Sequence, residues 1–400
     1  MADLDSAKLL WTPANAHETR TTQFMRKVNA KYGLSLSSYD QLWSWSTENI
    51  AEFWDLVWED TNIIGDRGPH VIDRSALPAD NPDWFVGSQV NWAENALWCR
   101  ASDKIAIIEA VEPTPDLASS PLRQITYAEL YIQVADIVSA LIEYGVKKGD
   151  RVASYSSNCI ETAVVCLATA AIGALWVSAA ADFGPDGVLE RFEQVKPKVI
   201  FAVNSVSSGT TGKPKPIVHR TGGMLIQSRK ELLICADMKP SDVFFYYTTT
   251  GWMMYQFLMG GLGVGCTILL YDGSPLRDPS CLWRMTDECK ITIFGTSAKY
   301  LDQLAVCLKP FPCQPAGFWP LSGYGTDEEV SNAQSRYQDA YFNAFKGIWH
   351  HGDYVRITTN GGVVMLGRSD GVLNPGGIRF GSSEIYELWD KLSKGAQTNV

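Results

Sequence analysis

The feature that most constrains the fold of this chain is an alternation of strand and helix patterns that starts near residue 126. Short apolar runs alternate with longer segments in which apolar residues recur every three or four positions. Strands joined through a helix run in the same direction, so this order predicts parallel sheets covered by helices, an α/β fold. The predicted strands are Arg151–Ser156, Leu175–Ala180, Lys198–Val203, Val243–Thr248, Cys266–Tyr271 and Ile291–Phe294, and the predicted helices are Ile160–Ile172, Pro185–Gln194, Cys281–Cys289 and one from Ser297.

One further helix can be placed by its N-terminal signal. Thr126 and Glu129 have the spacing of a capping box, and an apolar stripe follows them and ends near Gly145. The predicted stripe consists of Leu130, Val134, Ile137, Leu141 and Tyr144.

The first hundred residues are rich in tryptophan. Tyr39–Glu59 looks helical, and the spacing of Trp54 and Trp58 puts both on one face. Acidic rather than basic residues lie between the aromatic residues. We therefore expect these side chains to pack against the main body rather than to stack on nucleic acid bases.

Charge and composition exclude several classes of protein. The formal net charge of -10 argues against nonspecific binding to nucleic acid or to an anionic membrane. The longest apolar runs, such as Thr162–Ala181, contain polar residues and do not favour a membrane span. The nine cysteines form no CxxC motif, and the start MADLDSAKLL has no secretory pattern. We expect a cytosolic protein with reduced thiols.

The run SSGTTGKPK at Ser207–Lys215 has the composition of a phosphate-binding loop. Hydroxyl groups and glycine amides would donate hydrogen bonds to phosphate oxygens, and Lys213 would supply positive charge. The Walker A pattern is not met, because the two glycines are three apart and Pro214 follows the lysine. A Ser/Thr-rich turn without function is the alternative for an isolated GTTG.

The full string, with its continuation to His219, resembles the phosphate loop of the adenylate-forming acyl-CoA synthetases. Other segments are similar to the acetoacetyl-CoA synthetase group of that superfamily, and the resemblance runs from about Trp11 to Leu388. Those segments are WFVGSQVNWAENAL (Trp84–Leu97), TTTGWMMYQFLMGGL (Thr248–Leu262), LYDGSPL (Leu270–Leu276), CQPAGFW (Cys313–Trp319), HGDYVRI (His351–Ile357) and GRSDGVLNPGGIRFGSSEIY (Gly367–Tyr386).

This resemblance implies an enzyme that activates acetoacetate with ATP and then transfers the acyl group to CoA. Carboxylate and triphosphate are both anionic, so loop donors, lysine and Mg²⁺ would offset their repulsion. The implied partners are the small molecules acetoacetate, ATP and CoA, with no nucleic acid and no membrane.

The resemblance also assigns residues to the nucleotide. Asp353 is expected to accept hydrogen bonds from the ribose hydroxyls, and Arg368 to act nearby. The residues expected to hold the β- and γ-phosphates are Ser207, Ser208, Gly209, Thr210, Thr211, Gly212 and Lys213.

Five more residues receive roles by the same resemblance. Asp370 is expected at the hinge between a large and a small domain. Arg379 matches a phosphate-contacting arginine, and Gly376 lies in the turn that approaches CoA. Gly251 and Trp252 are expected to shape the acyl pocket.

Three parts of the family pattern are missing from this chain. The family places an αβ segment between Phe201–Asn204 and the phosphate loop, and an adenine-binding motif with barrel strands at the Leu308–Lys309 junction. The chain stops soon after Glu384, so we expect the small C-terminal domain with its catalytic lysine to be missing as well, and no catalytic residue is assigned. YGTDE at Tyr324–Glu328 resembles the adenine motif in composition, but it lies downstream of the place where that motif belongs.

The predicted fold is thus an incomplete large domain of an adenylate-forming synthetase, with stacked parallel αβ sub-domains and a residual barrel-like β region. We expect a Trp-rich segment over residues 1–100, the AMP-binding domain over 101–370, and the start of a truncated C-terminal domain over 371–400. Two alternatives remain: an inactive variant that at most binds nucleotide, and a ligase for another short-chain acid such as acetate or propionate.

Overall fold

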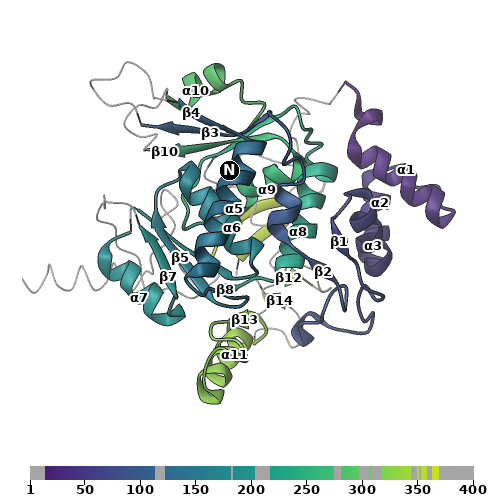
Figure 1. The fold of residues 1–400 in the computed structure, drawn as a ribbon. Coiled ribbons are helices and arrows are strands. Elements are labelled where there is room, and N and C mark those ends of the chain that lie inside the picture. The colour runs from purple at the N-terminus through teal and green to yellow at the C-terminus, as the bar shows by residue number, and fades with distance from the viewer. Residues whose placement is uncertain are drawn as a thin grey trace, which may run out of the picture.

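Two parallel sheets form the body of the molecule, and helices α5 and α6 lie between them (Figure 1). The computed structural model describes residues 14–112, 122–181, 183–202, 217–273, 281–296, 306–307, 317–343, 349–350, 353–357 and 363–368. The α/β class with parallel strands, predicted from the alternating pattern, is confirmed.

The first sheet has three parallel strands in the order β6-β5-β7. Its strands and their helices are β5 (Arg151–Ser156), β6 (Leu175–Ala180), β7 (Val199–Ala202), α5 (Tyr127–Glu143), α6 (Ile160–Ala171) and α7 (Pro185–Val195). The predicted bounds of β5 and β6 are confirmed to the residue, and the capping box of Thr126 and Glu129 is formed. The expected place of Tyr144 in the stripe is wrong, because α5 ends one residue earlier and leaves that side chain 76% exposed.

The second sheet has five strands in the order β11-β9-β10-β3-β4, of which only β4 is antiparallel to its neighbour. Its elements are β3 (Ile105–Val111), β4 (Leu122–Thr126), β9 (Val243–Tyr246), β10 (Thr267–Asp272), β11 (Ile293–Gly295), α8 (Thr221–Arg229), the π-helical turn η4 (Lys230–Cys235), α9 (Met253–Val264) and α10 (Cys281–Cys289). The main core joins both sheets, since residues of β3, β5, β10, α5, α6 and α9 share one buried cluster. The predicted helix from Ser297 lies outside the described residues.

The N-terminal helices form a separate aromatic cluster against α8 and η4. Trp54 and Trp58 are both buried in it, as their spacing predicts, with ring contacts to Trp84 and Phe85. The single predicted helix is interrupted at Asn49, which ends one helix and begins the next because asparagine favours caps over helix interiors. The elements here are η2 (Ala16–Glu18), α1 (Arg20–Tyr32), α2 (Tyr39–Glu48), α3 (Ile50–Asp60), β1 (Gly65–Asp66), η3 (Pro78–Asp80), β2 (Gln89–Val90) and α4 (Trp92–Ala96).

Short antiparallel pairs follow the second sheet. β8 pairs with β13, β12 with β14, and β15 with β16. These elements and the last helix are β8 (Ile217–Val218), β12 (Val306–Cys307), β13 (Gly317–Phe318), α11 (Asp327–Tyr341), β14 (Trp349–His350), β15 (Asp353–Ile357) and β16 (Val363–Arg368). The described strands form no closed barrel, so the barrel-like region stays a prediction. The domain boundaries also stay predictions.

Across the ranges that the structure describes, no helix combines the length and apolar character needed to cross a membrane.

Candidate active site

The nucleotide residues assigned from the sequence fall mostly outside the described part of the chain. The phosphate loop lies in residues 203–216, and Asp370, Gly376 and Arg379 lie in residues 369–400. Asp353 and Arg368 are Cα partners in the antiparallel register of β15 and β16. The two residues assigned to the nucleoside thus share one end of one hairpin.

The loop Thr248–Trp252 lies beyond the carboxyl end of β9 and is bound to the other sheet. The Thr250 hydroxyl donates to the carbonyl oxygen of Ser156 at 3.0 Å, and the Ser178 hydroxyl donates to the Thr250 carbonyl at 2.5 Å. The Asn158 side-chain nitrogen donates to the Thr248 carbonyl at 3.2 Å. Strands of both sheets therefore have their carboxyl ends near this loop. In open α/β sheets, ligands bind at the carboxyl ends of the strands.

Gly251 packs so closely against the Phe183 ring that a side chain here would require the two to move apart. A Cβ atom at this position would lie 2.9 Å from Cζ of Phe183 and 3.4 Å from the Ala180 nitrogen. The Phe183 ring in turn stacks on the guanidinium of Arg191 at 4.3 Å, and its carbonyl accepts from the Tyr155 hydroxyl at 2.7 Å. The glycine predicted for the acyl pocket thus has a steric reason in the structure.

Trp252 and Met253 form an exposed apolar surface at the start of α9. Their side chains are 44% and 59% exposed, although large apolar side chains usually favour burial. The Trp252 side chain does not cap the helix, and helix N-termini carry a partial positive charge. An apolar group and an anionic group of one small molecule could both be accommodated there.

Two polar atoms beside this loop have no hydrogen-bond partner in the described part of the chain. They are Oδ1 of Asn158, a residue that is 3% exposed, and Oγ1 of Thr249. Leaving such an atom unsatisfied costs about 1–3 kcal/mol, so a water or a ligand group is expected at each.

The sequence prediction missed Ser156, Asn158, Ser178 and Phe183 as parts of this site. Polar residues at the end of the otherwise buried strand Arg151–Ser156 were the signal that could have identified the first two.

Glu109 fixes the helix that follows Asn158. This glutamate is 4% exposed on β3, and it accepts the backbone N–H of Ile160 at 2.8 Å and a guanidinium N–H of Arg123 at 3.2 Å. Arg123 also binds Glu161, and this hydrogen bond lowers the pKa of the Glu161 carboxyl against the opposing effect of burial. The turn that carries Asn158 is thereby held against the five-stranded sheet.

The opposite end of α9 is bound by donors from three other regions. The last carbonyls of a helix have no partners within it, and here side chains supply them. The Tyr127 hydroxyl lies 3.2 Å from the Leu262 carbonyl and donates at 2.7 Å to the carbonyl of Cys266, two residues beyond the helix. The Trp98 indole donates to the Gly263 carbonyl at 2.9 Å. Arg229 donates to the same Gly263 oxygen, and burial lowers the pKa of this arginine to about 10.

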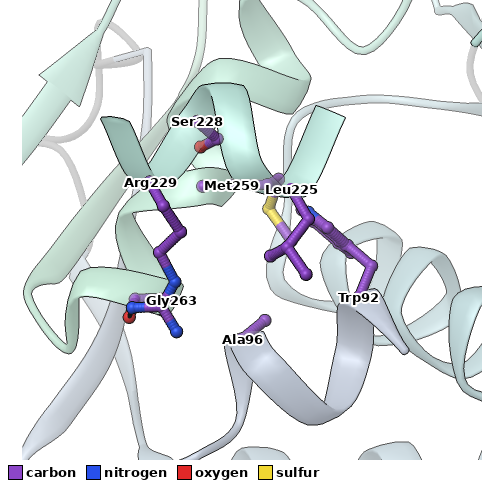
Figure 2. A pocket seen from close by; sticks show the side chains of 8 residues that line it. Trp92, Ala96, Leu225, Ser228, Arg229, Met259 and Gly263 are labelled. Atoms are coloured by element: carbon purple, nitrogen blue, oxygen red, sulfur yellow. Dashed lines mark hydrogen bonds between the residues drawn. The ribbon is translucent and has the colours of Figure 1, made fainter. Parts of the chain in front are cut away.

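Figure 2 shows a small cavity between α4, α8 and α9. Its volume of about 10 Å³ has room for one water molecule at most, so it is too small for a substrate. Ser228 Oγ and Arg229 Nε have no hydrogen-bond partner in the described ranges. The cavity is lined by Trp92, Ala96, Leu225, Ser228, Arg229, Met259, Gly260 and Gly263.

A larger groove of about 780 Å³ runs between α1, the end of α3 and the turn at residues 237–240. None of its lining residues belongs to the 248–252 loop. The groove and the 248–252 loop are therefore separate features of the molecule.

Tyr324 occupies the other end of the three-stranded sheet. Its ring lies 5.2 Å from that of Trp319, and the Arg151 guanidinium lies over both rings. Arg151 is the first residue of β5, so Tyr324 is at the amino ends of the strands, while the 248–252 loop is at the carboxyl ends. Thr326 caps α11, which is a structural role for the YGTDE segment. Both observations fit the prediction that this segment is not the adenine motif.

Within the described ranges, no group of three or more His, Cys, Asp or Glu side chains could hold a metal ion.

Two family models match the sequence. Residues 98–207 and 202–318 match the model described as AMP-binding enzyme, and residues 39–96 match the model described as Acetyl-coenzyme A synthetase N-terminus. The first model covers more than half of the chain.

Curated relatives are similar over nearly the whole chain. The sequence is 32% identical to acetoacetyl-CoA synthetase of Xenopus tropicalis, over 97% of this chain and 82% of that protein. It is 27% identical to malonamoyl-CoA synthetase of Penicillium aethiopicum, over 95% and 77% of the two chains. The solved structure of acetoacetyl-CoA synthetase from Streptomyces lividans superposes with a TM-score of 0.79 at 27% identity, covering 95% of this chain and 83% of that one.

The alignment with the Xenopus protein contains long gaps in this chain. About 388 residues, 97% of 400, are spread over 567 aligned positions, so about 180 positions have no counterpart here. The AMP-binding match is also divided at residues 202–207, next to the phosphate loop. The divided match lies at one of the two internal deletions predicted from the sequence, the one before the phosphate loop, and the deletion at Leu308–Lys309 stays a prediction.

Proposed function

Because this chain belongs to the family of AMP-binding enzymes and is an acyl-CoA synthetase of the AMP-forming kind, we propose that its acid substrate is acetoacetate. ATP and CoA are the other substrates of such ligases, and Mg²⁺ is their metal ion. The proposal includes the cytosol as the place of action. Relatives that share 31–32% of its residues and carry the name acetoacetyl-CoA synthetase support it.

The proposed reaction has two steps. An oxygen of the acetoacetate carboxylate attacks the α-phosphorus of ATP, the bond to the β-phosphate breaks, and pyrophosphate leaves. The sulfur of CoA then attacks the acyl carbon, AMP leaves with the bridging oxygen, and the thiol proton is released. Both steps bring anionic groups together, so preorganised donors matter more here than acid–base chemistry.

The proposed nucleotide site keeps the residues assigned from the sequence. The loop Ser207–Lys213 would hold the β- and γ-phosphates, and Asp353 would bind the ribose with Arg368 beside it. Their opposite positions in the β15–β16 register support a shared role. Asp370 would serve as the hinge.

The proposed CoA contacts are Gly376 in the approaching turn and Arg379 at a phosphate. Neither lies within the described residues, so both rest on the resemblance alone.

The observation that carries the acid-binding proposal is the geometry of the 248–252 loop. Close packing of Gly251 on Phe183 sets the path of the loop, and this leaves the Trp252 indole exposed beside the start of α9. An exposed aromatic face suits the short carbon chain of acetoacetate, and the positive end of the helix suits its carboxylate.

Pyrophosphate release with purified chain, ATP and Mg²⁺ tests the substrate. We expect a higher kcat/KM with acetoacetate than with acetate, propionate or malonamate, the last chosen because one relative is named for it. Equal or better turnover of one of the other acids would contradict acetoacetate as the substrate. It would leave the ligase chemistry in place.

A second candidate is a nucleotide-binding protein without turnover. The specific observation in its favour is the absence of about 180 aligned positions from this chain. Calorimetry with ATP, together with hydroxylamine trapping of any acyl-adenylate, separates the two candidates. ATP binding without pyrophosphate or hydroxamate from any acid would support the second.

A further inference from the structure

Strand β7 lies at the edge of the three-stranded sheet. On one side it pairs with β5 in parallel register, from Val199 opposite Val152 to Ala202 opposite Tyr155. Across the described ranges, no strand pairs with its other side. The outer N–H and C=O groups of β7 are therefore available to another strand.

The composition of β7 is that of an interior strand. All four residues, VIFA, are apolar, as in parallel strands that are covered on both faces and both sides. Strands at a natural edge usually carry a charge or a proline that blocks pairing. Lys198, just before the strand, is bound to Asp150 at 3.1 Å and does not provide that block.

One face of β7 is also left uncovered. Val199 and Phe201 pack against the main core, whereas Ile200 is 51% exposed on the opposite face. Helix α7 covers that face only over the neighbouring strands, where Val188 and Phe192 meet Ala153 and Ala179. The apolar face of the sheet therefore extends past α7 onto β7.

The match to the family model supplies a second observation at the same place. The family match is divided at residues 202–207, directly after β7, and about 180 aligned positions are absent from the chain. The break in the family match therefore falls at the same place as the exposed edge.

We propose that the free edge of β7 pairs with β7 of a second copy of this chain. In the antiparallel arrangement, a two-fold axis normal to the sheet passes between Ile200 and the partner's Ile200. Val199 then lies opposite the partner's Phe201, so each face of one sheet continues into the same face of the other. Two three-stranded sheets become one continuous sheet, and Ile200 is shielded by its own copy.

A second copy fits better than an unrelated strand. The two-fold arrangement matches apolar residues to apolar residues from Val199 to Phe201, and both edges are present at equal concentration. The inference does not depend on catalytic activity.

Sedimentation equilibrium of the full chain tests the proposal. We expect the wild type to approach twice the mass of one chain as its concentration rises. Ile200→Lys should shift it to the mass of a single chain, because a charge on the edge strand opposes pairing. Leu189→Lys on α7 is the matched control, since Leu189 is similarly exposed at 57%, and it should dimerise like the wild type.

Hydrogen–deuterium exchange gives a second measurement that needs no variant. Amides of residues 199–202 should exchange more slowly at high protein concentration than at low concentration, while those of exposed Leu189 should not change. Circular dichroism confirms that both lysine variants are folded. A wild type that stays monomeric, or equal dissociation by Leu189→Lys, would overturn the proposal; so would an unchanged dimer in Ile200→Lys.

Discussion

The two ends of helix α9 are built in opposite ways. At the C-terminal end, Trp98 and Arg229 donate hydrogen bonds to the Gly263 carbonyl, and Tyr127 donates to Cys266, two residues beyond the helix. At the N-terminal end no side chain caps the helix, and Trp252 and Met253 remain exposed. One end is anchored by residues far away in the chain, and the other faces the candidate acyl site.

This difference shows how a site can be exposed and still be well positioned. Residues that bind a substrate must be held in place by the structure around them. A helix that is fixed at one end can position such residues at its other end and still leave them exposed. We therefore expect the largest losses of activity from changes at the N-terminal end and the largest losses of stability from changes at the C-terminal end.

The largest effect should come from Gly251→Ala. Its Cβ would lie 2.9 Å from Cζ of Phe183, so the loop and the ring must move apart. A shift of about 1 Å can cost about 10²-fold in rate, so we expect a loss of that order in kcat/KM for the acid, with nearly unchanged thermal stability. Pyrophosphate release and a thermal melt measure the two.

Gly222→Ala is the control for that variant, since its Cβ would meet Val90 at an ordinary 3.5 Å. Adding Phe183→Ala to Gly251→Ala should recover part of the activity by making room. Equal losses of kcat/KM in Gly251→Ala and Gly222→Ala would show that the close contact between Gly251 and Phe183 is not important for activity.

Two glycines near the bound end of α9 should differ in their effect on stability. A Cβ on Gly261 would lie 2.8 Å from Ile268, 3.0 Å from Phe244 and 3.1 Å from Cys266, while a Cβ on Gly263 would meet no atom closer than 3.6 Å. We expect Gly261→Ala to cost about 2 kcal/mol by overpacking. Gly263→Ala should stay within about 1 kcal/mol and can even stabilise the helix. Urea denaturation measures both, and a reversed order would contradict the packing described.

Tyr127→Phe should have a smaller cost. It removes a buried hydroxyl that donates to the Cys266 carbonyl, which we expect to cost about 1–2 kcal/mol in free energy of unfolding. Tyr131→Phe on the same helix is the control, because Tyr131 is 41% exposed and its ring contact with Arg100 survives the change. We expect it to stay within about 0.5 kcal/mol. Similar losses in both would mean that the buried hydroxyl is not an anchor.

Sequence patterns predicted the bounds of several strands and helices, but they did not predict the hydrogen bonds that hold the C-terminal end of α9. The bounds of β5, β6 and α10 follow from local apolar runs, which is information carried by neighbouring residues. The bond from Tyr127 to Cys266 joins residues 139 positions apart, and no local pattern reveals it.

The candidate site shows the same limit. Gly251 and Trp252 could be assigned by resemblance, but the contact of Gly251 with Phe183 depends on how two sheets meet. Local reasoning also failed within the predicted helix Tyr39–Glu59, where Asn49 ends one helix and begins another.

The smallest effect is expected from Ser228→Ala at the cavity beside the bound end of α9. The Ser228 hydroxyl has no partner within the described ranges, so its removal should change the free energy of unfolding by less than about 0.5 kcal/mol. Ser178→Ala is the matched control at the open end, where a hydroxyl that donates to the Thr250 carbonyl is lost at a cost of about 1 kcal/mol. A loss of about 1 kcal/mol or more in Ser228→Ala would instead place a bridging water between Ser228 and Arg229. That water would then count among the groups that anchor α9.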